Sequence, residues 1–300
     1  MLRLERVSKT YRVGAFARTS LKAVRDVSFE LRPGEVVSLI GESGSGKSTI
    51  GRMILRLTQP TDGRITFEGT DITGLRGRGL KEYYRHAQGV FQDPFSTYNP
   101  IFRADRVFAM IRQSYFPNVR DAEWRDRVAD AISSVNLNPD LVLGKYPHQL
   151  SGGQLQRLLV ARALLLDIKL LVADEIISML DASTRIDVLN LLADLKERGL
   201  AVLFITHDLS LGNYLSDQTV ILRKGAVVER GTTEKVFGDP RHPYTRTLLA
   251  SVPRLGTRWE DLPVPETEGH ECDAPPEEVD DDHFVACFDR VHHGRKSESV

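Results

Sequence analysis

Residues 41–49 form a glycine-rich stretch whose surroundings constrain the fold more than any other part of the chain. The stretch fits the pattern G-x-x-x-x-G-K-[ST], and the five residues before it, 36–40, are an apolar run with the length of a buried strand. Apolar residues after it repeat at the i, i+3, i+4, i+7 spacing of an amphipathic helix: Ile50, Met53, Ile54 and Leu57. A buried strand, a tight loop and a helix in this order predict an α/β fold with a substantially parallel sheet.

The same alternation continues further along the chain. Residues 170–173 and 201–205 are short apolar runs that predict two more buried strands, and the apolar spacing over 188–195 predicts a helix between them. Residues 93–165 are largely polar-faced and helical in pattern. We therefore expect an α/β domain over residues 1–240, with a helical subdomain inserted at about 93–165.

The loop at 41–49 has the composition of a phosphate-binding loop. Its glycines allow backbone N–H groups to turn inward around phosphate oxygens, and the following helix adds the positive end of its dipole. Lys47 would reach the β- and γ-phosphates, and the Ser48 hydroxyl would ligate Mg²⁺. A glycine-rich turn without a ligand is the alternative, but the strand before it and the helix after it favour the phosphate loop. The candidate residues here are Gly41, Ser43, Gly44, Ser45, Gly46, Lys47, Ser48 and Thr49.

The apolar run at 170–173 ends in two acidic residues. Asp174 would hold Mg²⁺ through water, and Glu175 would polarise the attacking water as a general base. An Asp-Glu pair after a strand usually caps a helix, so this pattern alone is weak. A phosphate loop upstream favours the catalytic interpretation.

A second anion-binding helix start is predicted at Leu150-Ser151-Gly152-Gly153-Gln154. One triphosphate does not need two such sites in one chain, unless the second serves a nucleotide held by another chain. With this segment and the phosphate loop together, the sequence resembles the ATP-binding-cassette (ABC) proteins, whose signature is LSGGQ. The resemblance implies that Ser151, Gly152, Gly153 and Gln154 act in trans on a partner's nucleotide.

The resemblance also assigns roles outside these loops. It implies that Gln92 touches Mg²⁺ and senses the transporter, that Asp181 in Ser178-Met179-Leu180-Asp181 contacts the partner site, and that His207 contacts the γ-phosphate. It matches Tyr11 to the aromatic residue that stacks on adenine. An exposed strand tyrosine is the alternative at Tyr11, and a strand-end histidine is the alternative at His207.

Three further segments resemble the oligopeptide/dipeptide importer subfamily: residues 93–100, residues 146–149 and Asp239-Pro240-Arg241-His242-Pro243-Tyr244-Thr245. This resemblance implies an importer ATPase with Mg-ATP as cofactor. Its implied partners are a second ATPase subunit, with a heterodimer favoured, two permease subunits and an extracytoplasmic solute-binding protein. Related importers carry oligosaccharides or nickel, so the solute stays open.

Two interpretations outside transport compete with the importer. The first, and the alternative that we keep, is the ATPase subunit of a non-transport complex of the phosphonate-lyase type. A DNA-repair or ribosome-bound cassette fits poorly, since the former needs a long coiled coil between the phosphate loop and the signature, and the latter usually has two tandem cassettes. Only one cassette pattern is present, and we expect no nucleic-acid partner.

The chain departs from the family at two places. Ile176 stands where most relatives have a proline after the two acids, which loosens a turn but leaves both carboxylates. Cys272 and Cys287 resemble two of the four cysteines that bind an iron–sulfur cluster in many subfamily members, and two thiolates fall short of the usual four ligands. The sequence therefore does not favour a cluster.

The last sixty residues, 241–300, are expected to form an extension with an acidic tail. Residues 260–282 hold eleven Asp and Glu and no Lys or Arg, and prolines are frequent around them, which predicts an extended or partly disordered segment. Elsewhere the chain shows no apolar run long enough to cross a membrane and no secretory signal. We expect a peripheral protein at the cytoplasmic face of the cell membrane.

Overall fold

The structure is a computed structural model that describes residues 1–13, 19–251 and 274–287, and the chain divides into two compact units. The first unit comprises Met1–Leu75 and the chain from Leu203 onward, and the second comprises Arg76–Val202. Each unit contains a parallel strand pair: β3 (Val36–Ile40) with β9 (Gln218–Arg223), and β6 (Ala87–Val90) with β7 (Leu170–Asp174). The predicted α/β class and the predicted strands at 36–40 and 170–173 are confirmed.

An antiparallel sheet in the first unit has the strand order β2-β1-β4-β5. Its strands are β1 (Leu2–Val13), β2 (Thr19–Leu31), β4 (Asp62–Phe67) and β5 (Thr70–Asp71). Along β1 the side chains of Leu2 and Leu4 are fully buried while Arg3 between them is exposed, as the two-residue period of a strand requires.

The other strands of the first unit follow the order β11-β12-β10-β9-β3. Here β10 (Ala226–Thr232) pairs antiparallel with β9 on one side and with β12 (His283–Val285) on the other, and β11 (Glu277–Asp280) pairs with β12. Within the segment predicted to be extended or partly disordered, residues 277–285 form a hairpin of two paired strands, and this pairing was not predicted. Burial of His283 and Val285 against β10 stabilises it. Residues 252–273 lie outside the described residues.

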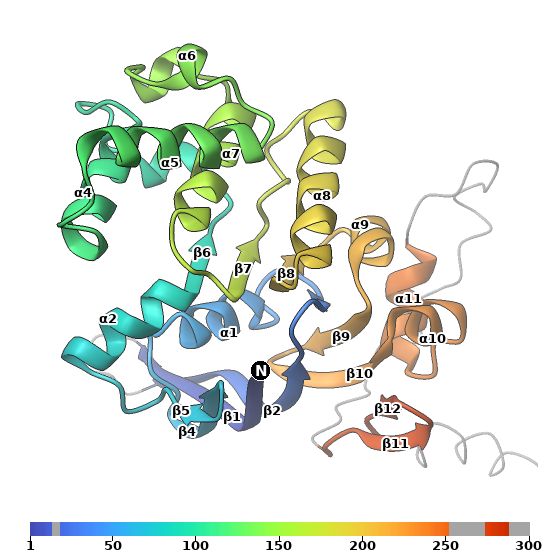
Figure 1. The fold of residues 1–300 in the computed structure, drawn as a ribbon. Helices are drawn as coiled ribbons and strands as arrows, with labels where there is room; N and C mark the ends of the chain where they lie inside the picture. The colour runs from blue at the N-terminus through green and yellow to red at the C-terminus, as the bar shows by residue number, and fades with distance from the viewer. Residues whose placement is uncertain (14–18, 252–273, 288–300) are drawn as a thin grey trace, which may run out of the picture. The chain divides into compact units, whose positions relative to one another are not determined.

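Four helices complete the described first unit: α1 (Lys47–Ile54), α9 (Leu209–Leu215), α10 (Thr233–Gly238) and α11 (Pro243–Ala250). Figure 1 shows α10 and α11, in orange, close to the hairpin and β10. One apolar cluster joins the last three helices to the strands, with Ile40, Leu209, Ile221, Val228, Val236 and Tyr244 all buried. The core of this unit therefore reaches from the end of β3 to α11.

Helices dominate the second unit, as the pattern over 93–165 predicts. They are α2 (Gly77–His86), α3 (Pro94–Thr97), α4 (Arg106–Tyr115), α5 (Asp121–Ser134), α6 (Pro139–Val142), α7 (Gly152–Leu164) and α8 (Ala182–Glu197), with a short 3₁₀ turn at Pro147–Gln149. Figure 1 shows α4, α5, α6 and α7 grouped in green. The remaining strand, β8 (Ala201–Thr206), begins in the second unit and ends in the first.

Candidate functional site

The loop between β3 and α1 has the geometry of an anion site. Gly46 caps α1 at φ +105°, and a Cβ built there would lie 2.5 Å from the Ala23 carbonyl oxygen, so only glycine fits. No side chain caps α1, which leaves its first-turn N–H groups directed out of the helix. Together with the helix dipole these donors attract an anion.

Lys47 places a positive charge inside this loop. The side chain is 5% exposed, and its Nζ donates to the carbonyl oxygens of Gly41 at 2.7 Å and Glu42 at 2.9 Å. The Ser45 Oγ is buried without a hydrogen-bond partner in the same loop. A buried ammonium, the N–H groups of a helix start and an orphaned hydroxyl fit a polyphosphate group.

Tyr11 lies on a strand that adjoins this loop through β2. Gly46 approaches Ala23 of β2, and the pairing of β1 with β2 sets Tyr11 opposite Leu21, two residues along from Ala23. The ring is partly exposed, with the Lys9 Nζ 5.0 Å from its centroid. A planar group bound next to the loop could stack on it.

His207 is exposed and follows directly after β8. Asp208 caps the next helix, α9, by accepting from Ser210 N at 2.9 Å and Leu211 N at 3.3 Å. Since α9 packs on β3, the structure gathers His207, Tyr11 and the loop within the first unit.

In the second unit the register of the parallel pair sets two candidate residues at one sheet edge. Val90 of β6 lies opposite Ala173 of β7, so Gln92 and Asp174 follow the carboxyl ends of neighbouring strands. Asp174 is 7% exposed, whereas Gln92 is exposed. Carboxylate, amide and hydroxyl oxygens are ligands that Mg²⁺ accepts, so Ser48, Gln92 and Asp174 suit it chemically.

Glu175 adopts an unusual backbone conformation for a non-glycine residue, with φ +51°. Its carbonyl oxygen accepts from the Ser178 N at 3.1 Å and the Ser178 Oγ at 2.9 Å, which holds the turn. A left-handed conformation costs about 1–3 kcal/mol and persists where the surroundings fix it. A proline at 176 would push Glu175 towards extended φ values, so the buried Ile176 is compatible with this turn.

The signature segment begins α7 with a capping box. The Gln154 N donates to the Ser151 Oγ at 3.2 Å, and the Ser151 N donates to the Gln154 Oε1 at 2.9 Å. The Ser151 hydroxyl accepts one bond in this arrangement and can still donate its own proton. Gln154 is folded back on the helix start, so its amide serves the cap.

Asp181 is likewise the N-cap of a helix, α8. Its carboxylate accepts from the Ser183 Oγ at 2.6 Å, the Thr184 N at 3.0 Å and the Thr184 Oγ1 at 2.8 Å. Hydrogen bonds from the Ser183 hydroxyl, and then from Thr184, hold the pKa of Asp181 well below its usual value. The side chain is thus a stable, exposed negative group.

The signature and the start of α8 touch. A Cβ built on Gly153 would overlap the Cγ2 methyl of Thr184, the residue that contacts Asp181. Neither Thr184 nor Ser178 was singled out from the sequence. The Asp181 N-cap that Thr184 completes has a local sequence signal, whereas the contact of Thr184 with Gly153 depends on helix packing. The structure therefore brings Ser151, Gly153 and Asp181 onto neighbouring helix starts.

We expect Gly153→Ala to lower ATPase turnover through a steric clash at this contact, because the substitution removes no functional group. The added methyl should displace Thr184 and misplace the α7 start, lowering ATPase turnover in the assembled complex about tenfold or more. Thr184→Ser removes the clashing methyl and keeps the hydroxyl, so the double variant should recover turnover. Steady-state ATPase assays of both variants check this, and a double variant as slow as Gly153→Ala would contradict it.

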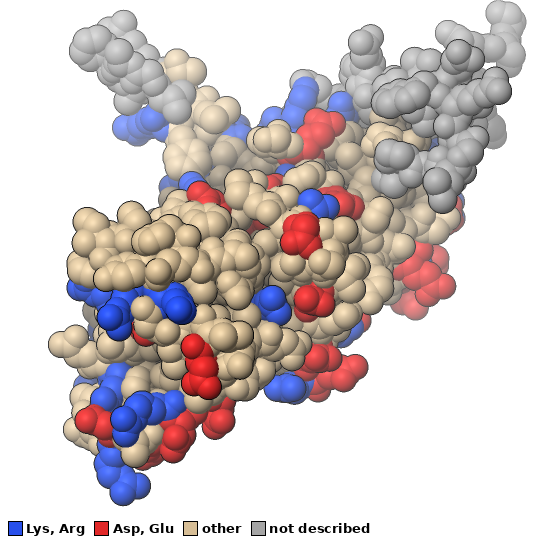
Figure 2. Space-filling view, turned by 90° about the horizontal axis from the view of Figure 1, so that it is seen from above, with Lys and Arg blue, Asp and Glu red and all other residues tan. Residues whose placement is uncertain are grey.

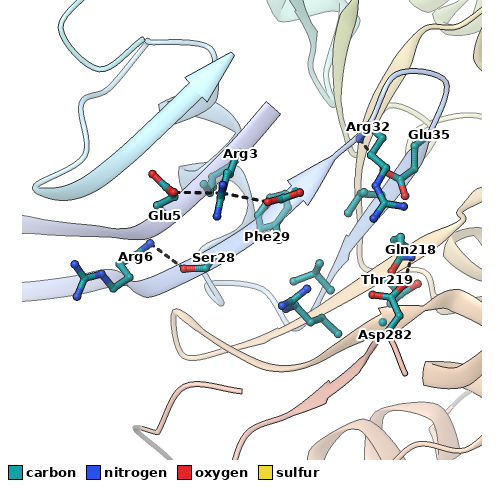
Figure 3. A pocket seen from close by; sticks show the side chains of 16 residues that line it. Arg3, Glu5, Arg6, Ser28, Phe29, Arg32, Glu35, Gln218, Thr219 and Asp282 are labelled. Carbon is teal, nitrogen blue, oxygen red and sulfur yellow. Dashed lines mark hydrogen bonds and ion pairs between the residues drawn. The ribbon is translucent and has the colours of Figure 1, made fainter. Parts of the chain in front are cut away.

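A pocket of about 410 Å³ in the first unit lies apart from all these residues. Figure 3 shows it between β1, β2 and β9, where Arg3 pairs with Glu5 at 3.2 Å and with Glu30 at 3.1 Å. None of the predicted nucleotide-site residues lines it. The geometry that suits a phosphate group is found in the loop at 41–49 and not in this pocket.

No cluster of three or more His, Cys, Asp or Glu suited to a metal ion occurs among residues 1–13, 19–251 and 274–287. The question of a cluster at Cys272 and Cys287 falls partly outside this range, because Cys272 is not among the described residues.

Two family models match the chain. The model for the ABC transporter family matches residues 24–178, and the model for the C-terminal region of oligopeptide/dipeptide transporters matches residues 228–278. The first covers the loop at 41–49, Gln92, the signature and the acids Asp174 and Glu175. The second covers the His-Pro-Tyr segment and ends at the second residue of the hairpin.

Individual proteins agree with the family models. A putative peptide import ATP-binding protein from Brucella ovis is 43% identical over 78% of this chain and 74% of its own length. The oligopeptide transport ATP-binding protein OppF of Streptococcus mutans is 40% identical over 95% of this chain and 94% of its own. Among solved structures, a dimeric ATP-binding cassette bound to ADP and Pi, MJ0796, matches with a TM-score of 0.70 and 30% identity, over 78% of this chain and 99% of that one.

Proposed function

This chain belongs to the ABC transporter family of ATPases, and on that premise we propose that it energises an importer for oligopeptides or dipeptides, or for a related solute such as an oligosaccharide or nickel. The observation that carries the proposal is the pairing of a complete cassette with the C-terminal region of oligopeptide/dipeptide transporters at residues 228–278. Two relatives are named as a putative peptide import ATP-binding protein and an oligopeptide transport ATP-binding protein.

In this proposal the first unit binds the nucleotide. The loop at 41–49 surrounds the phosphates, Lys47 compensates their charge, Tyr11 stacks on adenine and His207 contacts the γ-phosphate. Mg²⁺ would be held by Ser48, Gln92 and Asp174 and would neutralise charge on the phosphate oxygens. Glu175 acts as general base by accepting a proton from the attacking water.

Two cassettes would share two nucleotides between them. Each nucleotide would lie between one chain's phosphate loop and the other's Ser151, Gly152, Gly153, Gln154 and Asp181. The contact between Gly153 and Thr184 supports this, because it keeps the Ser151 hydroxyl and the Asp181 cap on adjacent helix starts. We infer a heterodimer of two ATPase chains as the working assembly.

The assembly would also include two permease subunits and an extracytoplasmic solute-binding protein, with this chain at the cytoplasmic face of the membrane. No helix in the described part of the chain is long and apolar enough to span a bilayer. Three apolar side chains shortly after Gln92 are exposed: Phe95 at 49%, Ile101 at 76% and Phe102 at 42%. Exposed apolar side chains so close in sequence to Gln92 suit a permease contact.

Ile101→Asp should weaken the association with the permeases about tenfold or more, because it inserts a charge into an apolar contact. ATP binding by the isolated chain should not change. Leu57→Asp is the matched control, since Leu57 is 59% exposed but belongs to the first unit. Pull-down of the permeases from solubilised membranes measures both variants, and equal retention of Ile101→Asp and wild type would argue against this surface.

The experiment that tests the function is identification of the proteins that copurify with the intact chain. Permease and solute-binding subunits would support the importer, and lyase subunits would replace it with the non-transport ATPase. Nucleic acid is not an expected partner. On the face in Figure 2, Lys and Arg are interspersed with Asp and Glu instead of forming one basic stripe.

We keep the domain division of 1–240 for the ATPase, with a helical subdomain at about 93–165, and 241–300 for the C-terminal extension. The position of β12 beside β10 supports close packing of that extension on the ATPase domain.

A further inference from the structure

The His-Pro-Tyr segment lies in the same unit as the nucleotide loop and packs against the strand that leads into it. Tyr244, in the first turn of α11, is 3% exposed. Its ring belongs to the apolar cluster that contains Ile40, the last residue before Gly41. A marker of the C-terminal region is therefore part of the core next to the phosphate loop.

The hydroxyl of Tyr244 bonds directly to that loop. The Glu42 backbone N donates to the Tyr244 Oη at 3.3 Å. Burial raises the pKa of Tyr244 to about 12, so the hydroxyl stays protonated near neutral pH and can accept and donate at once. The Arg223 guanidinium lies 5.1 Å from the ring centroid and further fixes it.

The planar peptide unit that contains the Glu42 N–H also contains the Gly41 carbonyl, whose oxygen accepts from the Lys47 Nζ at 2.7 Å. Because a peptide unit is rigid, a shift of the Glu42 N–H also shifts the Gly41 carbonyl. The Glu42 carbonyl, in the next peptide unit, accepts from the Lys47 Nζ at 2.9 Å and from the Ser45 N at 3.1 Å. The placement of Lys47 is thereby linked to the placement of Tyr244.

A buried polar network holds Tyr244 in turn. The Tyr244 N donates to the His242 Nδ1 at 3.1 Å, and the His242 N donates to the Glu229 Oε2 at 3.0 Å. The Glu229 Oε1 also bonds the Arg241 N at 2.7 Å and the His283 Nε2 at 2.8 Å. Glu229 and His283 are at most 2% exposed. Three hydrogen bonds thus hold the buried Glu229 carboxylate in place in a low-dielectric interior.

We propose that Tyr244 is a positioning residue for the nucleotide loop, and that the C-terminal region sets nucleotide affinity through it. The path runs from His283 of the hairpin through Glu229 and His242 to Tyr244, and from Tyr244 through Glu42 to Lys47. It rests on the assignment of residues 41–49 as the nucleotide loop. It gives the His-Pro-Tyr segment a role inside the chain, separate from any permease contact.

Tyr244→Phe tests this, because it removes one oxygen and keeps the ring in the apolar cluster. The Kd of the isolated chain for Mg-ATP should rise about three- to tenfold, as loss of one hydrogen bond allows. In the assembled complex KM should rise with little change in kcat, since binding and not chemistry is affected. Thr245→Val is the matched control: it removes a neighbouring, fully buried hydroxyl that has no partner, and it should leave Kd unchanged.

Hydrogen exchange of the Glu42 amide gives a second readout, in which the β3 amides report whether the variant is folded. In the wild-type chain this amide should be protected, and in Tyr244→Phe it should exchange faster while the β3 amides stay protected. An unprotected Glu42 amide in the wild type, an unchanged Kd in folded Tyr244→Phe, or an equal loss in Thr245→Val would each overturn the inference. If the wild-type chain does not bind Mg-ATP, the nucleotide loop itself is misassigned.

Discussion

Glu175→Gln should abolish ATP turnover, by about 10²–10⁴ in kcat, while leaving ATP binding intact. The substitution removes the proton acceptor and keeps the size of the side chain. The Glu175 carbonyl and Ser178 hold the turn that presents the side chain, so the φ of +51° should survive the change. If the partner site is also inactive, ATP should trap the closed dimer.

Phosphate release by the purified complex and ATP binding by calorimetry check this result. Glu197→Gln is the control, because Glu197 is an exposed residue of α8. Turnover close to wild type, measured with the partner's own catalytic site silenced, would remove Glu175 from the role of general base.

Lys47→Ala should lower ATP affinity tenfold or more, which corresponds to about 1.4 kcal/mol or above. Two effects add. The phosphates lose a compensating charge, and the carbonyl oxygens of Gly41 and Glu42 lose the donor that curls the loop. A surface lysine would not produce the second effect.

Calorimetric titration of the isolated chain with Mg-ATP measures the loss, with Lys145→Ala as the control because Lys145 is exposed and lies in the second unit. Unchanged affinity of Lys47→Ala would exclude Lys47 from the nucleotide site. Together with Glu175→Gln, this variant separates binding from chemistry.

The conformation around the loop at 41–49 was predictable because the sequence signals that define it are local. The apolar run at 36–40, the glycines and the helix spacing after Lys47 lie within about twenty consecutive residues, and the structure has β3 and α1 there. The helical character of 93–165 was predictable for the same reason. Local periodicity is the strongest signal that a single sequence carries.

The features that were missed depend on residues far apart in the chain. The hairpin β11–β12 forms where acidic composition predicted an extended segment, because His283 finds Glu229 fifty-four residues away and Val285 is buried against β10. The contact of Gly153 with Thr184 is likewise set by the packing of two helices. From composition one can infer that burying a charged or polar side chain is unfavourable, but not which distant residue will pair with it.

The pairing of β12 with β10 has a consequence for how this protein behaves in solution. Without the hairpin, β10 would end the sheet with a row of unpaired N–H and C=O groups, and such open edges recruit strands from other molecules. The acidic residues Glu277, Glu278 and Asp280 now occupy the outermost strand, where like charges on two molecules repel each other. Resistance to edge-to-edge aggregation therefore depends on the short segment 277–285, remote in sequence from every residue that we propose to contact nucleotide.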